Sequence, residues 1–341
     1  MPKVAVQIVT YNSLRYIFDC MESLMRQTFR DFSIIIIDNA SADGTINFLR
    51  SNYPNVNILQ NFKNFGFARA TNQGILMAKG EYVLSLNPDV ILTENYLEQL
   101  VSFADQKPQG ASFGGKILKL KTEYIDDIDK SGMIQAIKSN YLDSTGLEIA
   151  KSRRTVDRGE GELDQGQYDR IEEVFGLTGA CVLYRKSALD EIMINNEVVD
   201  QDFVAYKDDV DLSWRLRLYG FQNWYHPQII CYHHRGFPGR SAGMIKALAS
   251  RRKISKVLRG FSFCNQHLML VKNDEFVNIL LALPWFLARE IKLIFLTLLL
   301  EPFQIKTVIR FFKLLPKTIA KRRIIMRHKK TTALEMRKWY K

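Results

Sequence analysis

Apolar and polar positions in the first hundred residues alternate between two kinds of segment. Short runs that are apolar throughout are typical of buried strands in a parallel sheet. They cover 3–9, 32–37, 56–59 and 81–86. Segments in which apolar residues recur every three or four positions are typical of helices with one buried face. They cover 13–26, 44–50, 67–77 and 94–104. This alternation predicts a parallel sheet with helices on both faces and right-handed crossovers.

The pattern changes in the rest of the chain. Between 119 and 172 the periodicity is lost, and scattered glycines and acidic residues predict polar loops. A strand-like apolar run returns at 174–184, and 209–219 has helical spacing before Gly220, a residue that commonly ends helices. Near the C-terminus, apolar residues alternate with Lys and Arg, which predicts basic amphipathic helices.

The charge is divided unevenly along the 341 residues, whose formal net charge is +12. Residues 1–245 carry 26 Lys and Arg against 31 Asp and Glu, whereas 246–341 carry 22 against 5. A tail with this excess attracts polyanions such as anionic lipid headgroups, nucleic acid or an acidic protein surface. We therefore predict an α/β domain over 1–245 and a basic amphipathic helical region over 246–341.

Composition excludes several classes of protein. A hydrophobic content of 47% excludes a disordered or collagen-like chain. The four cysteines lie far apart without a CxxC pair, which argues against a disulfide scaffold or a zinc ribbon and fits a reducing compartment. The chain also lacks the G-x-G-x-x-G and P-loop motifs, so dinucleotide and P-loop binding have no support.

The apolar segment 276–300 is interrupted by Pro284, Arg289, Glu290 and Lys292. A membrane-spanning helix needs about 20 apolar residues with few charges, so we expect helices that lie in the membrane interface instead. The first residues are too short an apolar run for a signal peptide. Nucleic-acid binding by the tail is the rival hypothesis, but aromatic residues alternating with arginine are sparse there. A basic contact between subunits is the remaining alternative.

Polar clusters follow three of the predicted strands, at 10–12, 38–45 and 87–89. Ligands of open α/β sheets bind at the carboxyl ends of strands. A single polar residue at such a place is more often a helix N-cap, which is the simpler interpretation of Ser13 and Asp43. Three clusters at successive strand ends favour a ligand site.

These clusters and others along the chain resemble the motifs of family 2 glycosyltransferases, most closely the rhamnosyltransferase-like branch that builds bacterial surface polysaccharides. The motifs lie in the expected order at 9–13, 38–45, 64–72, 86–89, 179–181, 206–215 and 232–236. The resemblance implies a GT-A fold, which is a Rossmann-like three-layer α/β/α arrangement with a mostly parallel mixed sheet. It also implies an inverting hexosyltransferase that moves a sugar, with rhamnose favoured, from a nucleotide-diphosphate donor to a saccharide hydroxyl.

The resemblance divides the domain into a nucleotide-sugar half, 1–118, and an acceptor half, 119–245. It implies a dTDP- or UDP-linked donor. The positions that match the family's donor-binding residues are Thr10, Asn12, Asp38, Asn39, Asn64, Arg69, Asn72 and Asn87. Related enzymes often have aspartate at position 39, so the choice of base stays open.

Asn87-Pro88-Asp89 stands where the family has Asp-x-Asp, which binds a divalent metal on the donor diphosphate. Mg²⁺ or Mn²⁺ needs few protein oxygens there, because phosphates and waters complete its coordination shell. Asp89 is therefore the expected metal ligand, and a plain turn is the alternative. His233 resembles the family's strand-end histidine near the metal, with His234 as the alternative, and Arg235 is an expected diphosphate contact.

Three aspartates, Asp208, Asp209 and Asp211, open the predicted helix at 209–219, where carboxylates also complement the helix dipole. Asp209 matches the family's aspartate that deprotonates the acceptor hydroxyl, and inverting transfer needs one such base. Asp208 is expected to raise the proton affinity of its neighbour. Asp211 is expected to be structural and to pair with Arg215 one turn later.

Acceptors in such pathways are commonly saccharides on a polyprenyl lipid, which is consistent with a tail that docks on a bilayer. We therefore expect a peripheral or monotopic protein at the cytoplasmic face of the bacterial inner membrane. The alternative is a non-catalytic, membrane-bound nucleotide-sugar-binding or assembly subunit. The presence of both Asp89 and Asp209 argues against it, because a binding module needs no base.

Overall fold

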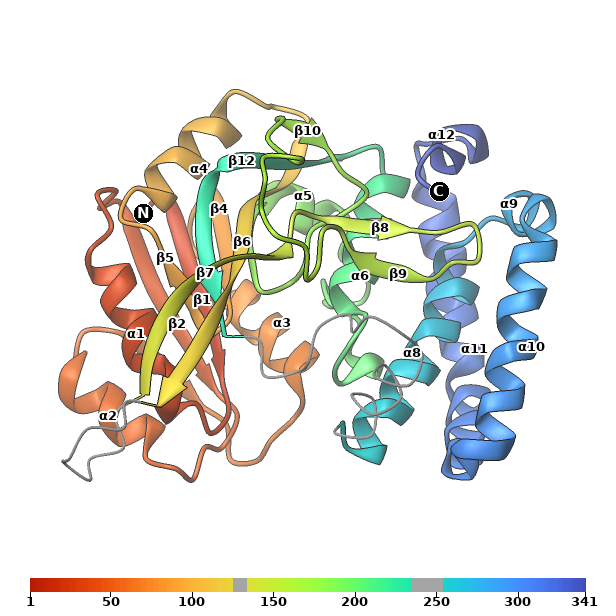
Figure 1. The fold of residues 1–341 in the computed structure, drawn as a ribbon, viewed down its shortest axis with the longest axis horizontal. Coiled ribbons are helices and arrows are strands. Elements are labelled where there is room, and N and C mark those ends of the chain that lie inside the picture. The colour runs from red at the N-terminus through yellow and green to blue at the C-terminus, as the bar shows by residue number, and fades with distance from the viewer. Residues whose placement is uncertain (125–133, 235–253) are drawn as a thin grey trace.

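The computed structural model describes residues 1–124, 134–234 and 254–341. A ten-stranded mixed sheet forms the larger part of the molecule, and a group of C-terminal helices lies at one end (Figure 1). The predicted domain boundary near 245 and the predicted diphosphate contact Arg235 both lie outside the described residues.

The first four predicted strands are confirmed and run parallel in the order β4-β1-β2-β3. They are β1 (Val4–Thr10), β2 (Phe32–Asp38), β3 (Asn57–Gln60) and β4 (Tyr82–Leu86). The predicted helices between and after them are also present. They are α1 (Leu14–Met25), α2 (Thr45–Asn52), α3 (Phe67–Met77) and α4 (Tyr96–Asp105).

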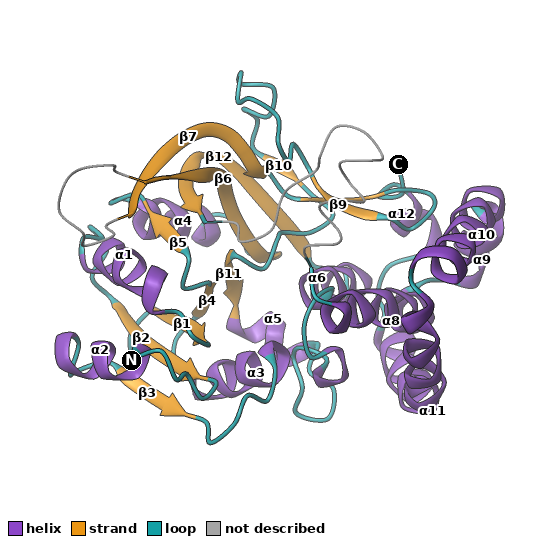
Figure 2. Cartoon of the chain, turned by 60° about the horizontal axis from the view of Figure 1, so that its bottom comes forward, coloured by secondary structure: helices purple, strands orange, loops and turns teal. Residues whose placement is uncertain are grey.

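The central strand β1 is buried on both faces, and its side chains divide between two hydrophobic cores. Val4, Val6 and Ile8 pack with α1 and α4 in one core. Ala5 and Val9 pack in the other, to which α3, α5 (Lys186–Glu191) and α6 (Asp208–Leu218) contribute. Figure 2 shows these helices around the sheet. A continuous apolar strand is therefore the consequence of a sheet covered on both sides.

The prediction of loops over 119–172 is confirmed at 158–171, which lie between two strands, but it is wrong over the described part of 119–157. The long strands β6 (Gly110–Tyr124) and β7 (Ile134–Ser144) pair antiparallel, and β8 (Leu147–Ile149) with β9 (Thr155–Asp157) forms a separate two-stranded sheet. Register shifts near Ile117 and Leu118 interrupt the β6–β7 ladder. Such bulges destroy the two-residue alternation by which a strand is found in a sequence.

The remaining strands complete the sheet around its antiparallel part. They are β5 (Val90–Leu92), β10 (Glu172–Glu173), β11 (Cys181–Arg185) and β12 (Gln222–His233). Only the end of the strand-like run at 174–184 therefore forms a strand. β12 pairs parallel with β6 and antiparallel with β5, which places His233 opposite Val90. The predicted GT-A type of sheet, parallel in one half and mixed in the other, is confirmed.

The C-terminal region is helical, as predicted. It contains α8 (Lys256–Asn273), α9 (Phe276–Leu281), α10 (Leu283–Leu300), α11 (Ile305–His328) and α12 (Ala333–Arg337). In Figure 1, α8 lies between α6 and α11, while α9 and α10 lie at the outer end of the molecule. Among the described residues, no helix combines the length and apolar content that crossing a bilayer requires.

Candidate active site

The loops after β1 and β2 meet in a network around Asp38, whose side chain is fully buried. Oδ1 of Asp38 accepts hydrogen bonds from the hydroxyls of Thr10 (2.8 Å) and Ser41 (2.5 Å), and Oδ2 accepts one from the Ser41 backbone N–H (2.9 Å). The backbone N–H of Asn12 donates to Ser41 Oγ at 2.9 Å. Three of the predicted donor-binding residues, Thr10, Asn12 and Asp38, are thus brought together at the carboxyl edge of the sheet.

The next three predicted residues lie on the neighbouring loop or turn toward it. The buried amide of Asn39 donates to the Gly66 carbonyl (3.1 Å) and accepts from Asn61 (3.0 Å). Oδ1 of Asn64 accepts from the Gly66 N–H at 2.8 Å. The exposed Arg69 guanidinium lies 4.2 Å from the ring centroid of Phe65. These contacts fix the shape of the loop that follows β3.

Asn72 is buried and turns away from this loop. Its Oδ1 accepts from the backbone N–H groups of Val198 and Val199, both at 2.9 Å, and its Nδ2 donates to the Val199 carbonyl at 2.7 Å. The side chain therefore joins α3 to the segment before α6. A direct contact between Asn72 and a nucleotide stays a prediction.

The Asn87-Pro88-Asp89 loop and Asp209 lie on either side of one short segment, Gly179–Ala180. The Asn87 N–H donates to the Ala180 carbonyl at 2.8 Å, and the Gly179 N–H donates to Oδ2 of Asp209 at 3.2 Å. A Cβ added to Gly179 would approach the Cβ of Asp209 to 3.3 Å, so the close approach favours glycine. Asp89 and Asp209, which are 120 positions apart in the sequence, thus belong to segments that meet at the same turn.

Asp89 and Asp143 lie on opposite sides of the buried His233 ring. Nδ1 of His233 is 2.8 Å from Oδ2 of Asp143, and Nε2 is 3.4 Å from Oδ1 of Asp89. Burial lowers the pKa of His233, but the carboxylate of Asp143, which is hydrogen-bonded to the ring, and the neighbouring carboxylate of Asp89 raise it to about 9. The His234 ring packs on Tyr16 instead, with centroids 5.4 Å apart. Of the two histidines, His233 is therefore the one whose side chain faces Asp89.

The donor set around Asp89 fits a hard cation that is held mainly by other ligands. Within the described residues, Oδ1 of Asp89 is buried and has no hydrogen bond of good geometry. A histidine whose Nδ1 is held by a carboxylate presents Nε2 outward, which is the usual arrangement of a metal-binding histidine. No group of three or more His, Cys, Asp or Glu side chains in the described chain is arranged to hold a metal by itself. A divalent ion here needs phosphate or water ligands as well.

Asp208 and Asp209 form a pair of partly buried carboxylates at the start of α6. Burial and the neighbouring Asp209 raise the pKa of Asp208 to about 7. Burial and the charge of Asp157 raise the pKa of Asp209, although hydrogen bonds from Gly179 and Val210 oppose this rise. The pair therefore holds a proton at a pH at which ordinary carboxyl groups have lost theirs, which suits proton transfer.

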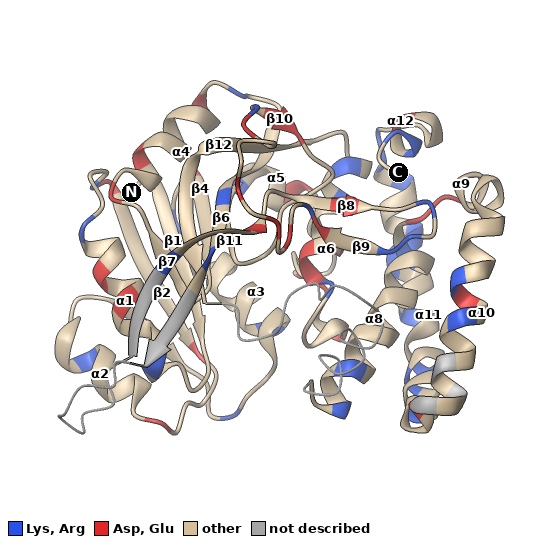
Figure 3. Cartoon of the chain, viewed as in Figure 1, with Lys and Arg blue, Asp and Glu red and all other residues tan. Residues whose placement is uncertain are grey.

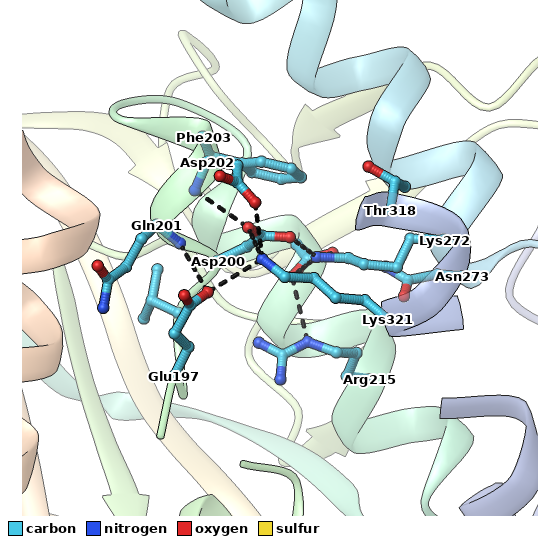
Figure 4. A network of polar contacts seen from close by, with 12 residues as sticks. Glu197, Asp200, Gln201, Asp202, Phe203, Arg215, Lys272, Asn273, Thr318 and Lys321 are labelled. Atoms are coloured by element: carbon cyan, nitrogen blue, oxygen red, sulfur yellow. Dashed lines mark hydrogen bonds and ion pairs between the residues drawn. The ribbon is translucent and has the colours of Figure 1, made fainter. Parts of the chain in front are cut away.

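Asp211 has a structural environment. It is fully buried, pairs with Arg215 as predicted (3.1 Å), and accepts from Lys272 (2.9 Å) and Asn273 (2.7 Å) of α8. Figure 4 shows that Lys272 and Lys321 also meet Asp200 in the same network. Basic residues of the tail therefore bind the acidic body of the chain itself.

Sequence reasoning missed Asp143 as a member of the site. It lies on β7, inside the segment that was expected to form loops, and reaches His233 only because both strands flank β6. Nothing in the local sequence around Asp143 indicates this partner, which is 90 residues away.

Comparison with known proteins identifies the family to which the chain belongs. The family described as "Glycosyl transferase family 2" matches residues 5–193. The N-acetylglucosaminyl-diphospho-decaprenol L-rhamnosyltransferase of Mycobacterium tuberculosis is 27% identical over 252 residues, which are 69% of this chain and 76% of that protein. The glycosyltransferase GlyG of Streptococcus pneumoniae is 30% identical over 114 residues, 33% of this chain and 38% of that protein.

Two solved structures share the fold. Residues 1–349 of S. aureus TarS in complex with UDP-GlcNAc superpose with a TM-score of 0.53 and 17% identity, covering 94% of this chain and 81% of that one. GalNAc-T7 with UDP, GalNAc and Mn²⁺ has a TM-score of 0.53 and 12% identity, covering 79% of this chain and 51% of that one. At these identities the likeness shows a common arrangement of helices and strands.

Proposed function

The chain belongs to glycosyl transferase family 2, and we propose that it transfers a sugar from a nucleotide diphosphate to a hydroxyl of a lipid-linked saccharide with inversion at the anomeric carbon. Rhamnose from a dTDP-linked donor is the favoured substrate. The similarity to a mycobacterial L-rhamnosyltransferase, which is named for a decaprenol-linked acceptor, supports this choice. The synthesis of cell-surface polysaccharide is the corresponding role.

One observation carries the proposal: the Asn87–Asp89 loop and the Asp209 carboxylate meet at Gly179–Ala180. Sugar transfer needs a group that stabilises the leaving diphosphate and a base for the attacking hydroxyl, on opposite sides of the anomeric carbon. The two aspartates flank one turn and supply one candidate for each role. A protein that only bound the nucleotide would not need the second.

In this mechanism, Asp209 accepts the proton of the acceptor hydroxyl as its oxygen bonds to the anomeric carbon. The bond from that carbon to the diphosphate oxygen breaks, and the nucleotide diphosphate leaves from the opposite face. The Gly179 N–H, which donates to Oδ2 of Asp209, fixes the orientation of the base. Asn87, half-buried beside the same turn, is placed to contact the sugar or ribose.

Asp89 and His233 would hold a divalent ion, Mg²⁺ or Mn²⁺, together with the donor diphosphate. Such an ion neutralises charge that develops on the leaving diphosphate. The buried Oδ1 of Asp89, which has no hydrogen bond of good geometry within the described chain, supports this role. Mn²⁺ is present in the GalNAc-T7 structure that shares the fold. Asp143 orients His233 by holding its Nδ1.

The nucleotide is proposed to lie against the loops after β1, β2 and β3, where Thr10, Asp38 and Asn39 form the buried base of the network. Asn12, Asn64 and Arg69 are the more exposed of the predicted contacts. The TarS structure that shares the fold contains UDP-GlcNAc. A dTDP- or UDP-linked donor is therefore proposed.

The outer C-terminal helices are proposed to contact a membrane surface at the cytoplasmic face of the inner membrane. Many of their large apolar side chains are exposed to solvent. A large exposed apolar patch usually marks a surface that another protein or a membrane covers. The exposed side chains include Phe276, Leu281, Trp285, Ile291, Phe295, Ile309 and Phe312. Because Lys317 and Lys321 of α11 bind the body instead, the apolar side chains are the main support for this contact, as in interfacial helices.

The experiment that tests the function is a transfer assay with the full chain, Mn²⁺ and a panel of dTDP- and UDP-sugars. The acceptor is a polyprenyl-diphosphate saccharide in detergent, and NMR gives the anomeric configuration of the product. We expect one donor to give product with inverted configuration. Donor binding by calorimetry without product from any acceptor would support the non-catalytic binding subunit instead, and retained configuration would contradict the single-base mechanism.

A further inference from the structure

A basic pocket lies between the acceptor side of the sheet domain and the C-terminal helices. It encloses about 250 Å³ and is lined from β9, the loop before α6, α8 and α10. Its cationic residues are Arg154, Lys207, Arg259 and Arg289, and no Asp or Glu is among the described residues that line it. Figure 3 shows basic residues on the helices that surround this region.

The positive charge of the pocket is only partly neutralised. Arg259 pairs with Glu301, and Arg289 pairs with Glu290 at 2.6 Å. Within the described chain, Lys207 and Arg154 have no carboxylate at ion-pair distance, and Nζ of Lys207 donates only to the Thr155 hydroxyl, at 3.1 Å. The Nε of Arg259 is buried without an acceptor among these residues. Buried donors without acceptors are costly, so the pocket suits an anion with several oxygen atoms.

The pocket lies close to the proposed base. Lys207 precedes Asp209 by two residues, so their Cα atoms are at most about 7 Å apart. Asn265 of α8 holds the loop that carries Lys207, because its Nδ2 lies 2.8–2.9 Å from the carbonyls of Phe203, Ala205 and Tyr206. Burial lowers the pKa of Lys207, and the charges of Asp209 and Asp157 only partly oppose this fall. The C-terminal helices thus help to place both the cation and the base.

The same helix that lines the pocket also carries an exposed apolar face. Arg289 and Leu293, one turn apart on α10, line the pocket. Ile291, Ile294 and Phe295 lie on the other faces of the helix and are 57–65% exposed. A ligand that fits both features has an anionic head and an apolar tail.

We propose that the basic pocket binds the phosphate or diphosphate group that joins the acceptor saccharide to its lipid. The lipid chain then lies along the exposed apolar face of α10, and the saccharide extends from the pocket toward Asp209. This inference rests on the proposed function and identifies the part of the acceptor that the enzyme recognises. Arginine and lysine side chains bind phosphate oxygens strongly through charge-assisted hydrogen bonds.

The test uses the full chain and two variants, Arg154→Gln and Lys207→Gln, with the surface variant Arg26→Gln as a matched control. The acceptor is a polyprenyl-diphosphate saccharide in neutral phosphatidylcholine vesicles. Losing one hydrogen bond to a charged group should raise the KM for this acceptor roughly tenfold or more in each pocket variant. The KM of the control should equal that of the wild type. An unchanged KM in both pocket variants would overturn the proposal.

Two further measurements separate the possible sources of the anion. Vesicles with phosphatidylglycerol but no lipid diphosphate should bind the wild type and the pocket variants equally, and inorganic phosphate should inhibit only weakly. If the pocket variants bound phosphatidylglycerol vesicles more weakly than the wild type, the pocket would be a general site for lipid headgroups, and the proposal would be overturned. Nucleotide binding by calorimetry should stay unchanged in the variants. If the proposed function were wrong, the wild-type protein itself would transfer no sugar to the acceptor.

Discussion

Two groups of buried carboxylates in this molecule differ in what surrounds them. In one, Asp200 and Asp211 meet Lys272 and Lys321 of the C-terminal helices, and every carboxylate oxygen has a donor among the described residues. Figure 4 shows Asp200 between the two lysines. In the other, Oδ1 of Asp89 is buried without a hydrogen bond of good geometry, and His233 lies 3.4 Å away. The same residue type therefore serves as a structural clamp in the first group and as a candidate ligand in the second.

The pKa directions follow the same difference. Burial raises the pKa of Asp200, but Lys272 and Lys321 lower it well below its ordinary value. At the Asp208–Asp209 pair no such lysines are at ion-pair distance among the described residues, and burial raises both pKa values. Carboxylates that are paired with buried lysines hold the fold together, whereas Asp89, Asp208 and Asp209, which have no lysine at ion-pair distance among the described residues, are available for a metal or a proton.

The largest expected effect is on the clamp. Lys321→Met should lower the free energy of unfolding by about 3–5 kcal/mol, because it leaves Asp200 buried with fewer cations. Lys317→Met is the matched control on the same helix. Lys317 is about half exposed and pairs with Asp202, so its loss should cost no more than about 1 kcal/mol. Denaturant titration measures both, and equal losses would contradict the structural role of Lys321.

Asp89→Asn should have the opposite profile, with little change in stability and a large change in binding. The affinity for nucleotide diphosphate in Mn²⁺ should fall by more than the 10- to 100-fold typical of losing an outer partner of a metal ligand. Calorimetry with and without EDTA measures this difference, and the surface variant Asp190→Asn is the control. An Asp89→Asn protein whose affinity still depended on Mn²⁺ would exclude Asp89 as a ligand.

Asp143→Asn should have a smaller effect on the same measurement. The amide oxygen can still accept from Nδ1 of His233, but without a charge it holds the ring less firmly. We expect Mn²⁺-dependent affinity to fall by roughly tenfold, at the lower end of the range for such partners. A fall as large as that of Asp89→Asn would indicate that Asp143 is itself a ligand.

The smallest expected effect is a shift in pH dependence. A base acts only when deprotonated, and burial raises the pKa of both aspartates, that of Asp208 to about 7, so kcat/KM should rise with pH above the range in which ordinary carboxyl groups titrate. Asp208→Asn removes the neighbouring charge and should move this rise to lower pH. A pH–rate profile of both proteins measures the shift, and coincident profiles would contradict coupling between the two aspartates.

Stability provides a second check on the same pair. The folded pKa of Asp208 is higher than its unfolded value, so the native state holds the proton more tightly. This contribution to stability is fully present below about pH 4 and is lost as the pH rises through about 7. Between about pH 4 and about pH 7, the free energy of unfolding should therefore fall less in Asp208→Asn than in the wild type.

Sequence patterns predicted the parallel half of the fold well, because strands buried on both faces are continuously apolar. They failed at β6, β7 and β12, where bulges interrupt the alternation and β12 shifts register between His226 and Ile230. A bulge is a property of the pairing between strands, so it leaves no regular signal in either strand alone.

The residues of the candidate site were also predicted only in part from the sequence. Asp89, His233 and Asp209 lie within motifs, but Asp143 and the pocket residue Arg154 lie outside them and reach the site only through contacts between distant segments. The basic tail was expected to face polyanions outside the protein, whereas Lys321 binds Asp200, 121 residues earlier. Charge along a sequence indicates an electrostatic preference, and only the fold shows which partner satisfies it.

The most direct test of the proposed function compares the wild type with Asp209→Asn in a single-turnover transfer assay with the lipid-linked acceptor. Calorimetry measures donor binding by the same two proteins. We predict that the variant binds the nucleotide sugar as tightly as the wild type, while transfer slows by about 10²- to 10⁴-fold through loss of the base. Transfer at the wild-type rate by Asp209→Asn would contradict the account.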